Sequence, residues 1–519
     1  MEKPHPLKPM KEKYAFRHMF PFIGIVLAVL VAMLWPLLKP GYFVTDDGEW
    51  MVIRLSAFYQ SLASGQFPVR YLGRLNYSYG YPVANFLYPG FLYLGSVLHV
   101  LGLSFVDAVK MICIGSVVGG AVFLYFSLRR RFSHLSAFFG TFSFITAPYL
   151  LYDMYVRGSV GEVLGLFAAT VCLFSIVLEV PWLLAPSFAF LIISHNTIAL
   201  LTGFGLLLFA LVSKRRQKLL TGIFLGIGMA SFFWLPALIE KNLVRFDHTV
   251  ISNPNTYLIT LSTAPLLGFA FIIALGLLLG FRKKTIPQDT IAFVITSVAL
   301  MLSLRLSSPV WNISFFARLV QFPYRFLILI GLFGPWLVAF ALDAVKGWKK
   351  YALMGIFVVL FFIGSVPIIS SVQYVSRPLG FYTTNEGSTT VANEYMPGWI
   401  SEFPTKRPVE TLEVLDGDAT LSIRTFTGER LEVAIDAKED TLMQINKIYY
   451  PGWGVTIDNT LVPVNYHNAM GVMRIIVPSG HHTVRAAFRE TPFRFITDLI
   501  SLVSGILWVI VLWQWKKRT

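Results

Sequence analysis

Cysteine and charge are both scarce in this chain. Two of its 519 residues are cysteines, Cys113 and Cys172, and they lie far apart inside apolar segments, which argues against a disulfide framework or a thiolate metal site. Charged residues make up 14% of the chain and hydrophobic residues 55%, a balance unlike that of soluble globular proteins. We therefore expect a polytopic membrane protein in which both cysteines are packing residues.

The net charge of +15 could suggest nucleic acid, but the basic residues form small clusters between apolar runs rather than one continuous face. Such clusters are typical of cytoplasmic loops, so we expect a lipid bilayer and no nucleic acid as partner. The basic N-terminus, Met1 to Arg17, precedes an apolar stretch without a small-residue cleavage site, which predicts a retained first span. The other clusters are Arg129–Arg131, Lys214–Arg216, Arg282–Lys284, Lys346–Lys350 and Lys516–Arg518.

Apolar runs of about 20 residues mark the candidate membrane spans. If all of them crossed, the cluster Arg129–Arg131 would lie outside. Treating segment 86–103, which Pro82 and Pro89 flank, as re-entrant or interfacial brings all five clusters to the cytoplasmic side and leaves about 12 spans. Both termini are then cytoplasmic. The candidates are 20–39, 86–103, 107–128, 135–151, 163–179, 181–194, 197–213, 219–239, 260–281, 289–305, 326–344, 351–369 and 495–513.

Three carboxylates, Asp46, Asp47 and Glu49, directly follow the first span. Ionised groups near hydrocarbon are costly and tend to persist where they have a function. The topology places them on the outer face, together with most of the other unusual polar residues. This convergence predicts a site at the outer membrane surface. The segments that share the face are 153–162, His195, 240–248, 318–325 and 370–494.

Segment 370–494 differs in composition, with short alternating runs separated by turn residues. It predicts a small antiparallel β domain, a sandwich, tethered by spans at both ends over the outer opening of the bundle. The chain then divides into a helical bundle, 1–369, with a long first outer loop, 40–86; the extracytoplasmic β domain, 370–494; and a final span with a basic tail, 495–519. The expected strands are 412–415, 420–424, 431–435, 442–445, 455–457, 472–477 and 483–488.

Short motifs occur along most of the chain. The first outer loop contains Asp-Asp-Gly-x-x-x-x-x-Arg over Asp46–Arg54, then Gly65–Pro68 and Gly80–Pro82. The later motifs are Tyr155–Glu162, Ser194–Asn196, Trp234–Ala237 with Glu240, Gln321–Arg325, Tyr395–Pro397, Tyr449–Trp453 with Val455 and Asp458, and Pro478–His481.

In this order the motifs resemble the bacterial YfhO-like membrane proteins, also described as 6-pyruvoyl-tetrahydropterin synthase-related, within the GT-C glycosyltransferase superfamily. The resemblance implies an enzyme that moves a sugar from a polyprenyl-phosphate donor to a cell-envelope glycan or protein outside the cytoplasmic membrane. It also implies that an acidic residue of the first outer loop is a general base or a metal ligand. The superfamily has metal-dependent and metal-independent members, so Mg²⁺ or Mn²⁺ on Asp46, Asp47 and Glu162 stays open.

An inverting transfer needs a carboxylate that takes the proton from the attacking acceptor hydroxyl. Asp47 is the first choice, with Asp46 or Glu49 as the second. The leaving lipid phosphate is already ionised, so fixed positive charge serves it better than a general acid, and arginine binds phosphate bidentately. Interfacial snorkelling is the alternative role for each arginine. The candidates are Arg157 and Arg325, then Arg318, Arg70 and Arg245.

Four further residues could support the site. Glu162, five positions after Arg157, could orient that arginine or join a metal site. His195 and Asn196 could hydrogen-bond sugar hydroxyls or be ordinary interfacial residues, and Glu240 follows one of the shared motifs. A secondary transporter or lipid flippase is the alternative function. It predicts internal repeats and ionisable groups at mid-membrane, neither of which is evident here, so the enzyme is favoured over it and over a non-catalytic scaffold.

Overall fold

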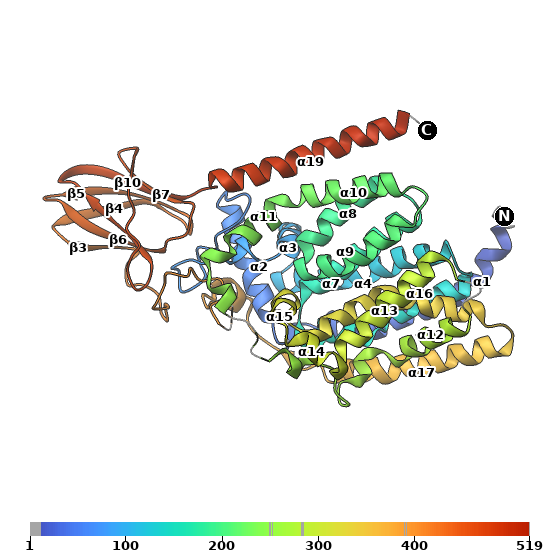
Figure 1. Ribbon diagram of the computed structural model, residues 1–519. Coiled ribbons are helices and arrows are strands. Elements are labelled where there is room, and N and C mark those ends of the chain that lie inside the picture. Colours follow the sequence, from blue (N-terminus) through green and yellow to red (C-terminus); the bar gives the residue numbers. More distant parts are fainter. Residues whose placement is uncertain are drawn as a thin grey trace.

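A helical bundle carries a β domain at one end of the molecule (Figure 1). The computed structural model describes residues 12–248, 251, 253–281, 285–388, 390 and 392–517. The helices are α1 (Glu12–Leu38), α2 (Gly48–Ala63), α3 (Gly90–Val100), α4 (Phe105–Arg129), α5 (His134–Ile145), α6 (Pro148–Tyr152), α7 (Val160–Val177), α8 (Pro181–Ser194), α9 (Asn196–Leu211), α10 (Arg216–Met229), α11 (Ser231–Ile239), α12 (Phe269–Gly280), α13 (Pro287–Ser303), α14 (Ser308–Trp311), α15 (Ser314–Val320), α16 (Leu327–Ala344), α17 (Trp348–Ser370), α18 (Leu379–Thr384) and α19 (Pro492–Lys517).

Six helical stretches of the described chain are long and apolar enough to cross a membrane, or seven if the bent pair α10 and α11 forms one span. Several other apolar helices are shorter, at 10–17 residues. The expected count of about 12 spans is therefore not confirmed. Helix α3 rises about 16 Å over its length. That is roughly half the hydrocarbon thickness, and the interfacial assignment of segment 86–103 stays a prediction.

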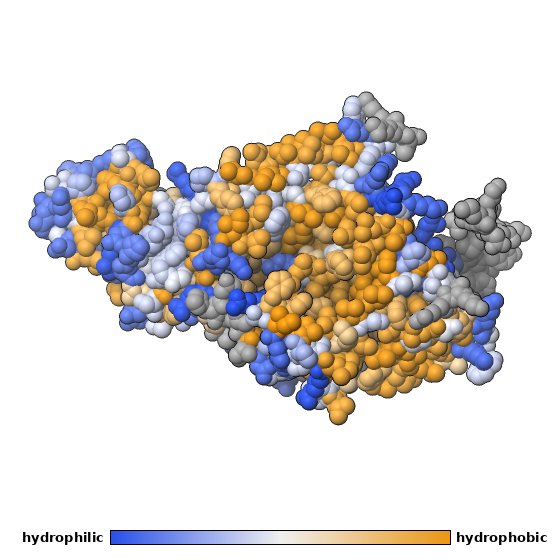
Figure 2. Space-filling view, in the orientation of Figure 1, coloured by the Kyte–Doolittle hydropathy of each residue, from blue (hydrophilic) through white to orange (hydrophobic). Residues whose placement is uncertain are grey.

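The basic loops that the structure describes gather at the end of the bundle opposite the β domain (Figure 1). Arg131 forms a 3.1 Å ion pair with Asp289, and the ammonium group of Lys350 donates to the Ser136 hydroxyl. Lys218, at the start of α10, lies over the ring of Trp515 near the end of α19. Between this end and the β domain, the surface in view is mostly hydrophobic (Figure 2). The cluster 282–284 lies outside the described residues.

Helices α7 and α16 form the centre of the bundle. Their apolar stretches are 83% and 94% buried, whereas those of α17 and α19 are 28% and 11% buried. Close packing in the centre depends on small residues: a Cβ atom on Gly140 of α5 would lie 2.7 Å from the carbonyl oxygen of Pro335 in α16. Helix α19 runs along the outside of the bundle (Figure 1), so most of its apolar surface faces a surrounding bilayer.

The β domain is an antiparallel sandwich. One sheet has the order β4-β5-β10-β7-β8 and the other β3-β6-β9, and both contribute to one core through Val433, Met443, Ile475 and Val484. All seven expected strands are present, and β8 is an additional one. The strands are β3 (Leu412–Asp416), β4 (Ala419–Phe426), β5 (Arg430–Ala437), β6 (Thr441–Ile448), β7 (Trp453–Ile457), β8 (Thr460–Val462), β9 (Val472–Val477) and β10 (Gly480–Phe488); β1 (Tyr42–Phe43) and β2 (Tyr374–Val375) pair outside the sandwich.

The first outer loop is built into the base of the β domain. The hydroxyl of Tyr71 lies 2.9 Å from the carbonyl oxygen of Ile448, and its ring packs against Trp453 and Phe488. Gly73 approaches the backbone so closely that an added Cβ would lie 2.3 Å from the Cα of Gly428. The loop therefore fixes the position of the sandwich relative to the bundle.

Two residues that we expected in the site hold the domains together. The carboxylate of Glu240 accepts hydrogen bonds from the Arg494 guanidinium at 2.9 and 2.7 Å and from the Tyr450 hydroxyl at 2.9 Å. Arg70 donates to the carboxylates of Glu490 and Asp498 at 3.0 and 3.1 Å. Glu240 and Arg70 are both buried: Glu240 is joined to α19 and to the β domain, and Arg70 to Glu490 before α19 and to Asp498 within it. The roles expected for these two residues in donor binding and catalytic support stay predictions.

Glu240→Ala should lower stability strongly because it leaves the buried Arg494 guanidinium without a counter-ion. Breaking a buried pair from one side costs about 3–5 kcal/mol. We expect a clearly lower thermal unfolding midpoint of the detergent-solubilised protein. Glu432→Ala, which removes a partner of the exposed Arg485, is the matched control and should leave the midpoint almost unchanged. Equal shifts of the unfolding midpoint in the two variants would show that the Glu240–Arg494 pair does not stabilise the protein as expected.

Candidate functional site

The acidic loop between α1 and α2 is attached to a turn that carries Arg157. The backbone amides of Asp46 and Asp47 each donate a 2.9 Å hydrogen bond, to the carbonyl oxygens of Val156 and Arg157. The turn, η2 (Asp153–Arg157), is one π-helical turn, a feature that is frequent at functional sites. Asp47 precedes the first residue of α2, yet its carboxylate makes no capping bond there. Its oxygens therefore remain available for other work.

Gly158 makes the close approach of the loop possible. It follows η2 with φ of +69°, a left-handed conformation that other residues adopt at a cost. An added Cβ would lie 2.4 Å from the hydroxyl oxygen of Thr45 and 2.6 Å from the amide nitrogen of Gly48. Glycine is thus required at this position both for the backbone conformation and for the space.

Glu162, in the first turn of α7, joins two arginines that are distant in the sequence. Its Oε1 atom lies 2.8 Å from Nη1 of Arg157 and 2.9 Å from Nε of Arg325. Arg157 also pairs with Asp153, and the hydroxyl of Tyr149 lies 3.4 Å from Oε2 of Glu162. Both carboxylates are fully buried. Two cations and two anions thus balance in a low-dielectric setting where an unpaired charge would be costly.

A strained turn positions Arg325. Gln321 has φ of +65° and ψ of −58°, and the amide of Phe322 donates to the carbonyl oxygen of Val320, which defines the rare form of the γ-turn. Nη1 of Arg325 donates to this carbonyl oxygen at 2.9 Å and to Oε1 of Gln321 at 3.0 Å. Strain of this kind persists where the surrounding contacts over-determine it, as these two hydrogen bonds do.

The two arginines keep donors for a ligand. A guanidinium has five N–H donors. Among the residues that the structure describes, Nε and Nη2 of Arg157 and Nη2 of Arg325 have no acceptor. The ring of Phe322 lies beneath both guanidinium groups, at 5.7 and 4.8 Å, and restricts their orientation. The pair can therefore receive an anion without releasing Glu162.

Tyr88 lies where the acidic loop and the arginine cluster meet. Burial raises the pKa of its hydroxyl; the charge of Glu162 raises it further, that of Arg54 lowers it, and that of Asp47 raises it. The Tyr88 ring packs 4.4 Å from the His195 ring, whose Nε2 atom is 3.7 Å from Oε1 of Glu162. His195 thus borders the cluster but lies beyond hydrogen-bonding distance of the carboxylate.

The two aspartates of the loop differ in environment. The pKa of Asp46 is raised from its ordinary value, first by partial burial and then by the neighbouring Asp47 carboxylate, while Arg157 opposes the shift. The side chain still reaches solvent, and Asp47 is more covered. Both carboxylates are close enough to the cluster for their charges to act on its members.

The structure brings together six of the expected site residues and separates the others. Glu49 accepts hydrogen bonds from Arg377 and Tyr382 at 2.9 and 3.1 Å, so it joins α2 to α18 and to the residue Arg377 before that helix, and within the described chain it has no contact with the cluster of Glu162. Asn196 is exposed and accepts from the amide of Thr197. Arg318 is exposed on α15. The residues brought together are Asp46, Asp47, Arg157, Glu162, His195 and Arg325.

Sequence reasoning missed Asp153, Tyr149 and Tyr88. Asp153 precedes Arg157 by four residues, the spacing of a side-chain pair on one helical face, and this signal could have identified it. The two tyrosines carry no such signal because Tyr is common at membrane interfaces. Their role depends on contacts that only the fold creates.

The residues that the structure describes include no group of three or more His, Cys, Asp or Glu side chains arranged to hold a metal ion. Glu162 accepts two arginine donors at one carboxylate oxygen. Its other oxygen, Oε2, accepts from the hydroxyl of Tyr149 at 3.4 Å.

No protein-family model matches the chain, and no curated protein matches it. Among solved structures, the fold is similar to the arabinofuranosyltransferase AftD from Mycobacteria, with a TM-score of 0.47 and 15% identity over 67% of this chain and 27% of that one. It is also similar to the apo oligosaccharyltransferase of Archaeoglobus fulgidus, with a TM-score of 0.44 and 12% identity over 68% and 56% of the two chains. The chain thus spans 27% of the length of the first and 56% of the second.

Gly158→Ala should detach the acidic loop from η2, because the new Cβ has no space beside Thr45. We expect faster hydrogen exchange at the amides of Asp46 and Asp47 and a lower unfolding midpoint. Gly347→Ala is the matched control: Gly347 has a similar φ of +64°, but nothing lies within 4 Å of an added Cβ. Its ψ of −151° is adopted almost only by glycine, so alanine should strain the backbone there at least as much as at Gly158 while leaving exchange in the loop unchanged. Equal hydrogen exchange at Asp46 and Asp47 in both variants would contradict the close contact between Gly158 and the acidic loop.

Proposed function

We propose that the protein is a membrane glycosyltransferase that moves a sugar from a polyprenyl-phosphate donor to an acceptor outside the cytoplasmic membrane, with inversion at the anomeric carbon. The observation that carries this proposal is the pair of backbone hydrogen bonds from Asp46 and Asp47 to the turn of Arg157. Because of these bonds, the two candidate bases lie beside the guanidinium group of Arg157, which has N–H donors without an acceptor among the described residues. A sugar transfer from a lipid phosphate needs this combination.

The reaction follows from these groups. The carboxylate of Asp47, free of capping, takes the proton from the acceptor hydroxyl while the hydroxyl oxygen attacks the anomeric carbon. The bond between that carbon and the phosphate oxygen breaks, and its electron pair leaves with the polyprenyl phosphate. The free donors of Arg157 and Arg325 bind the phosphate oxygens and stabilise the charge that develops there. Asp46 is the alternative base.

Glu162 serves this chemistry as a positioning residue. It holds both guanidinium groups in place before the donor arrives, so that little reorganisation is needed during transfer. With Asp153 it also balances their charge. Because the two arginines are balanced by two carboxylates, they bind a phosphate less tightly than unpaired arginines would. This weaker binding favours release of the polyprenyl phosphate after transfer.

The side of the membrane follows from the positive-inside rule. The basic loops that the structure describes lie at the end of the bundle opposite the β domain (Figure 1), and such clusters stay cytoplasmic. The site lies at the other end, where η2 finishes and α7 begins. We therefore assign the site and the β domain to the outer face of the plasma membrane, where a cell-envelope glycan or protein is the acceptor.

A transporter or flippase fits this arrangement less well. Transporters place their coupling groups near mid-membrane, commonly at interrupted helices. The cluster of Glu162 instead lies at the starts of α7 and α16, at one end of the bundle. Carrier translocation without sugar transfer would support the transporter against the enzyme.

Asp47→Asn should abolish transfer while the protein folds and binds carrier normally, because asparagine keeps the shape but cannot take the proton. We expect a loss of about 10²–10⁴-fold in the rate. The measurement is transfer of labelled sugar from a polyprenyl-phosphate donor in membranes, with Asp46→Asn assayed alongside. Glu49→Gln, in the same loop but paired with Arg377, is the control and should stay active. Full activity in both aspartate variants would overturn the assignment of the base.

Arg325→Lys should weaken the use of the donor, because lysine cannot donate to Glu162, the strained turn and a phosphate at once. We expect a raised KM for the donor and a lower kcat. Arg318→Lys, on the same outer end but exposed, is the matched control and should behave like the unmodified protein. Similar KM and kcat values for the two variants would show that Arg325 does not bind the donor phosphate.

A further inference from the structure

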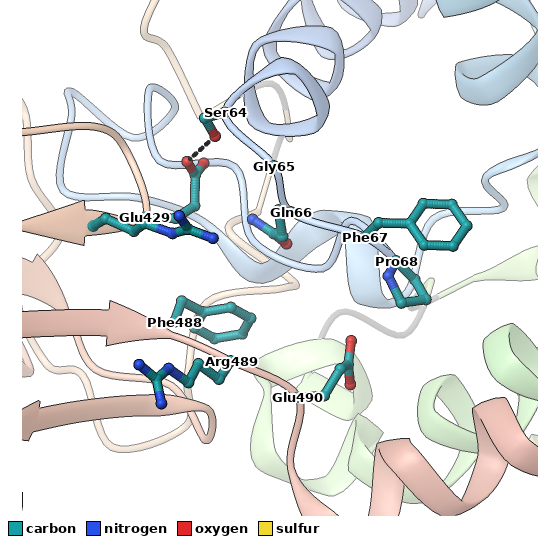
Figure 3. Close-up of a pocket in the computed structure, with 10 residues that line it drawn as sticks. Ser64, Gly65, Gln66, Phe67, Pro68, Glu429, Phe488, Arg489 and Glu490 are labelled. Carbon is teal, nitrogen blue, oxygen red and sulfur yellow. Dashed lines mark hydrogen bonds between the residues drawn. The ribbon is translucent and has the colours of Figure 1, made fainter.

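The seam between α2 and the β domain contains two adjacent cavities. The smaller, of about 200 Å³, is lined by residues 64–68, Glu429, Arg430 and residues 488–490 (Figure 3). The larger, of about 390 Å³, shares Ser64 and Glu429 with it and extends along α2 toward α18. Most of its lining residues are of polar types, among them Gln60, Ser61, Arg74, Thr383, Glu386, Arg407, Thr427 and Lys447.

Two cations line the larger cavity without a carboxylate partner. The ammonium group of Lys447, 3% exposed, donates to the carbonyl oxygens of Gly73 and Ser78 at 3.2 and 2.7 Å. Arg74 donates to the Ser56 hydroxyl at 2.7 Å and to the carbonyl oxygens of Ile53, Tyr382 and Thr383. Across the described residues, neither cation forms an ion pair.

The carboxylates of this cavity are bound by other groups. Glu386 pairs with Arg407 and accepts from the Ser78 hydroxyl at 2.8 Å. Glu429 accepts from the Ser64 hydroxyl at 2.9 Å, as Figure 3 shows, and from the amide of Gly73 at 3.2 Å. The lining therefore holds three cations, Arg74, Arg407 and Lys447, against two carboxylates, and the carboxylates act on Lys447 and Arg74 without direct contact. An anion would be stabilised by the remaining positive charge and by direct contact with these two cations in the buried seam.

The same cavity has features that suit a sugar ring. Phe426, 46% exposed, presents its ring 5.2 Å from the Lys447 ammonium group and provides an apolar face. Two buried lining atoms, Nε of Arg74 and the hydroxyl of Thr427, have no hydrogen-bond partner among the described residues. Since Lys447 uses two of its three donors on carbonyl oxygens, one N–H also remains for a ligand.

We infer that the larger cavity binds an acidic saccharide, with its carboxylate or phosphate at Lys447 and Arg74 and a sugar ring on Phe426. This inference rests on the proposed function in one respect: it makes the saccharide part of the acceptor. Ala57, which lines the cavity, lies ten residues along α2 from Asp47, which is about 15 Å of helix. An acceptor chain can therefore lie along α2, with its acidic part in the seam and its reacting hydroxyl at Asp47.

Binding of the anion should depend on pH through Lys447. Burial lowers the pKa of its ammonium group to about 8, against the opposing effect of Glu429 and Glu386. Arg74 and Arg407 also face the cavity and stay charged. The anion binds the protonated amine, so affinity should be full below pH 8 and fall as the pH rises above it. Lys447→Met should remove this dependence.

The test measures binding of three disaccharides to the purified full-length protein by calorimetry: one with a uronate, the same disaccharide with a phosphate, and the uncharged parent. We expect at least tenfold tighter binding of one charged form, and the preferred form identifies the acidic group. Phe426→Ala should weaken binding of all three, and Lys447→Met should abolish the preference for charge. Phe426→Ala alters an exposed side chain, so it retains the test if Lys447→Met does not fold.

Lys438→Met is the matched control, because Lys438 directly follows β5 of the same domain, is exposed, and pairs with Asp418 away from the cavity. It should bind all three disaccharides as the unmodified protein does. Equal binding of charged and uncharged forms, or normal binding by Phe426→Ala, would overturn the inference.

Failure of this inference is distinguishable from failure of the proposed function. Asp47→Asn should still bind the charged disaccharide although it transfers no sugar. If transfer depends on Asp47 but no disaccharide binds in the seam, the cavity inference alone is wrong. If the disaccharide binds but the unmodified protein transfers no sugar, the proposed enzyme function is wrong and the cavity remains a saccharide site.

Discussion

The carboxylate of Glu162 lies where three segments that are distant in the sequence meet. Its Oε1 atom accepts from Arg157 at the end of η2 and from Arg325 before α16, while its own backbone begins α7. Removing this carboxylate would leave two buried guanidinium groups with Asp153 as the one remaining counter-charge among the residues described here. The positions of η2, α7 and the start of α16 thus depend on one set of ionic contacts.

The acidic loop depends on the same contacts indirectly, through η2. Asp46 and Asp47 are held by the carbonyl oxygens of Val156 and Arg157, so the loop keeps its place only while η2 keeps its shape. Gly158 allows the approach, and the strained turn at Gln321 completes the setting of Arg325 on the far side. Backbone strain and buried charge, both costly, occur here together, which is typical of sites where function outweighs stability.

Much of this architecture could be predicted from the sequence where the signal is local. The strands could, because β5 alternates buried Leu431, Val433 and Ile435 with more exposed neighbours; β8 was missed because three residues are too few to show alternation. Asp47, Arg157, Glu162 and Arg325 stood out because ionisable residues are rare in apolar surroundings.

The number of spans could not be predicted, because hydropathy does not distinguish a helix buried in protein, such as α16, from one that faces lipid, such as α19. The ion pairs of Glu49, Arg70 and Glu240 could not be predicted, because their partners, Arg377, Glu490 and Arg494, are hundreds of residues away.

Charge compensation separates the two places where the protein could meet a ligand. In the cluster of Glu162, cations and anions balance, so an arriving phosphate gains from free donors rather than from net charge and can leave after the reaction. In the seam, Lys447 and Arg74 make direct contacts with carbonyl and hydroxyl acceptors only, and the lining holds one more cation than carboxylates, so an anion gains from net charge as well as from donors. This difference is what the proposed function requires, because its carrier would turn over and its acceptor would be held while it is extended. Helix α2, which begins at the acidic loop and ends at the seam, fixes the distance between the two.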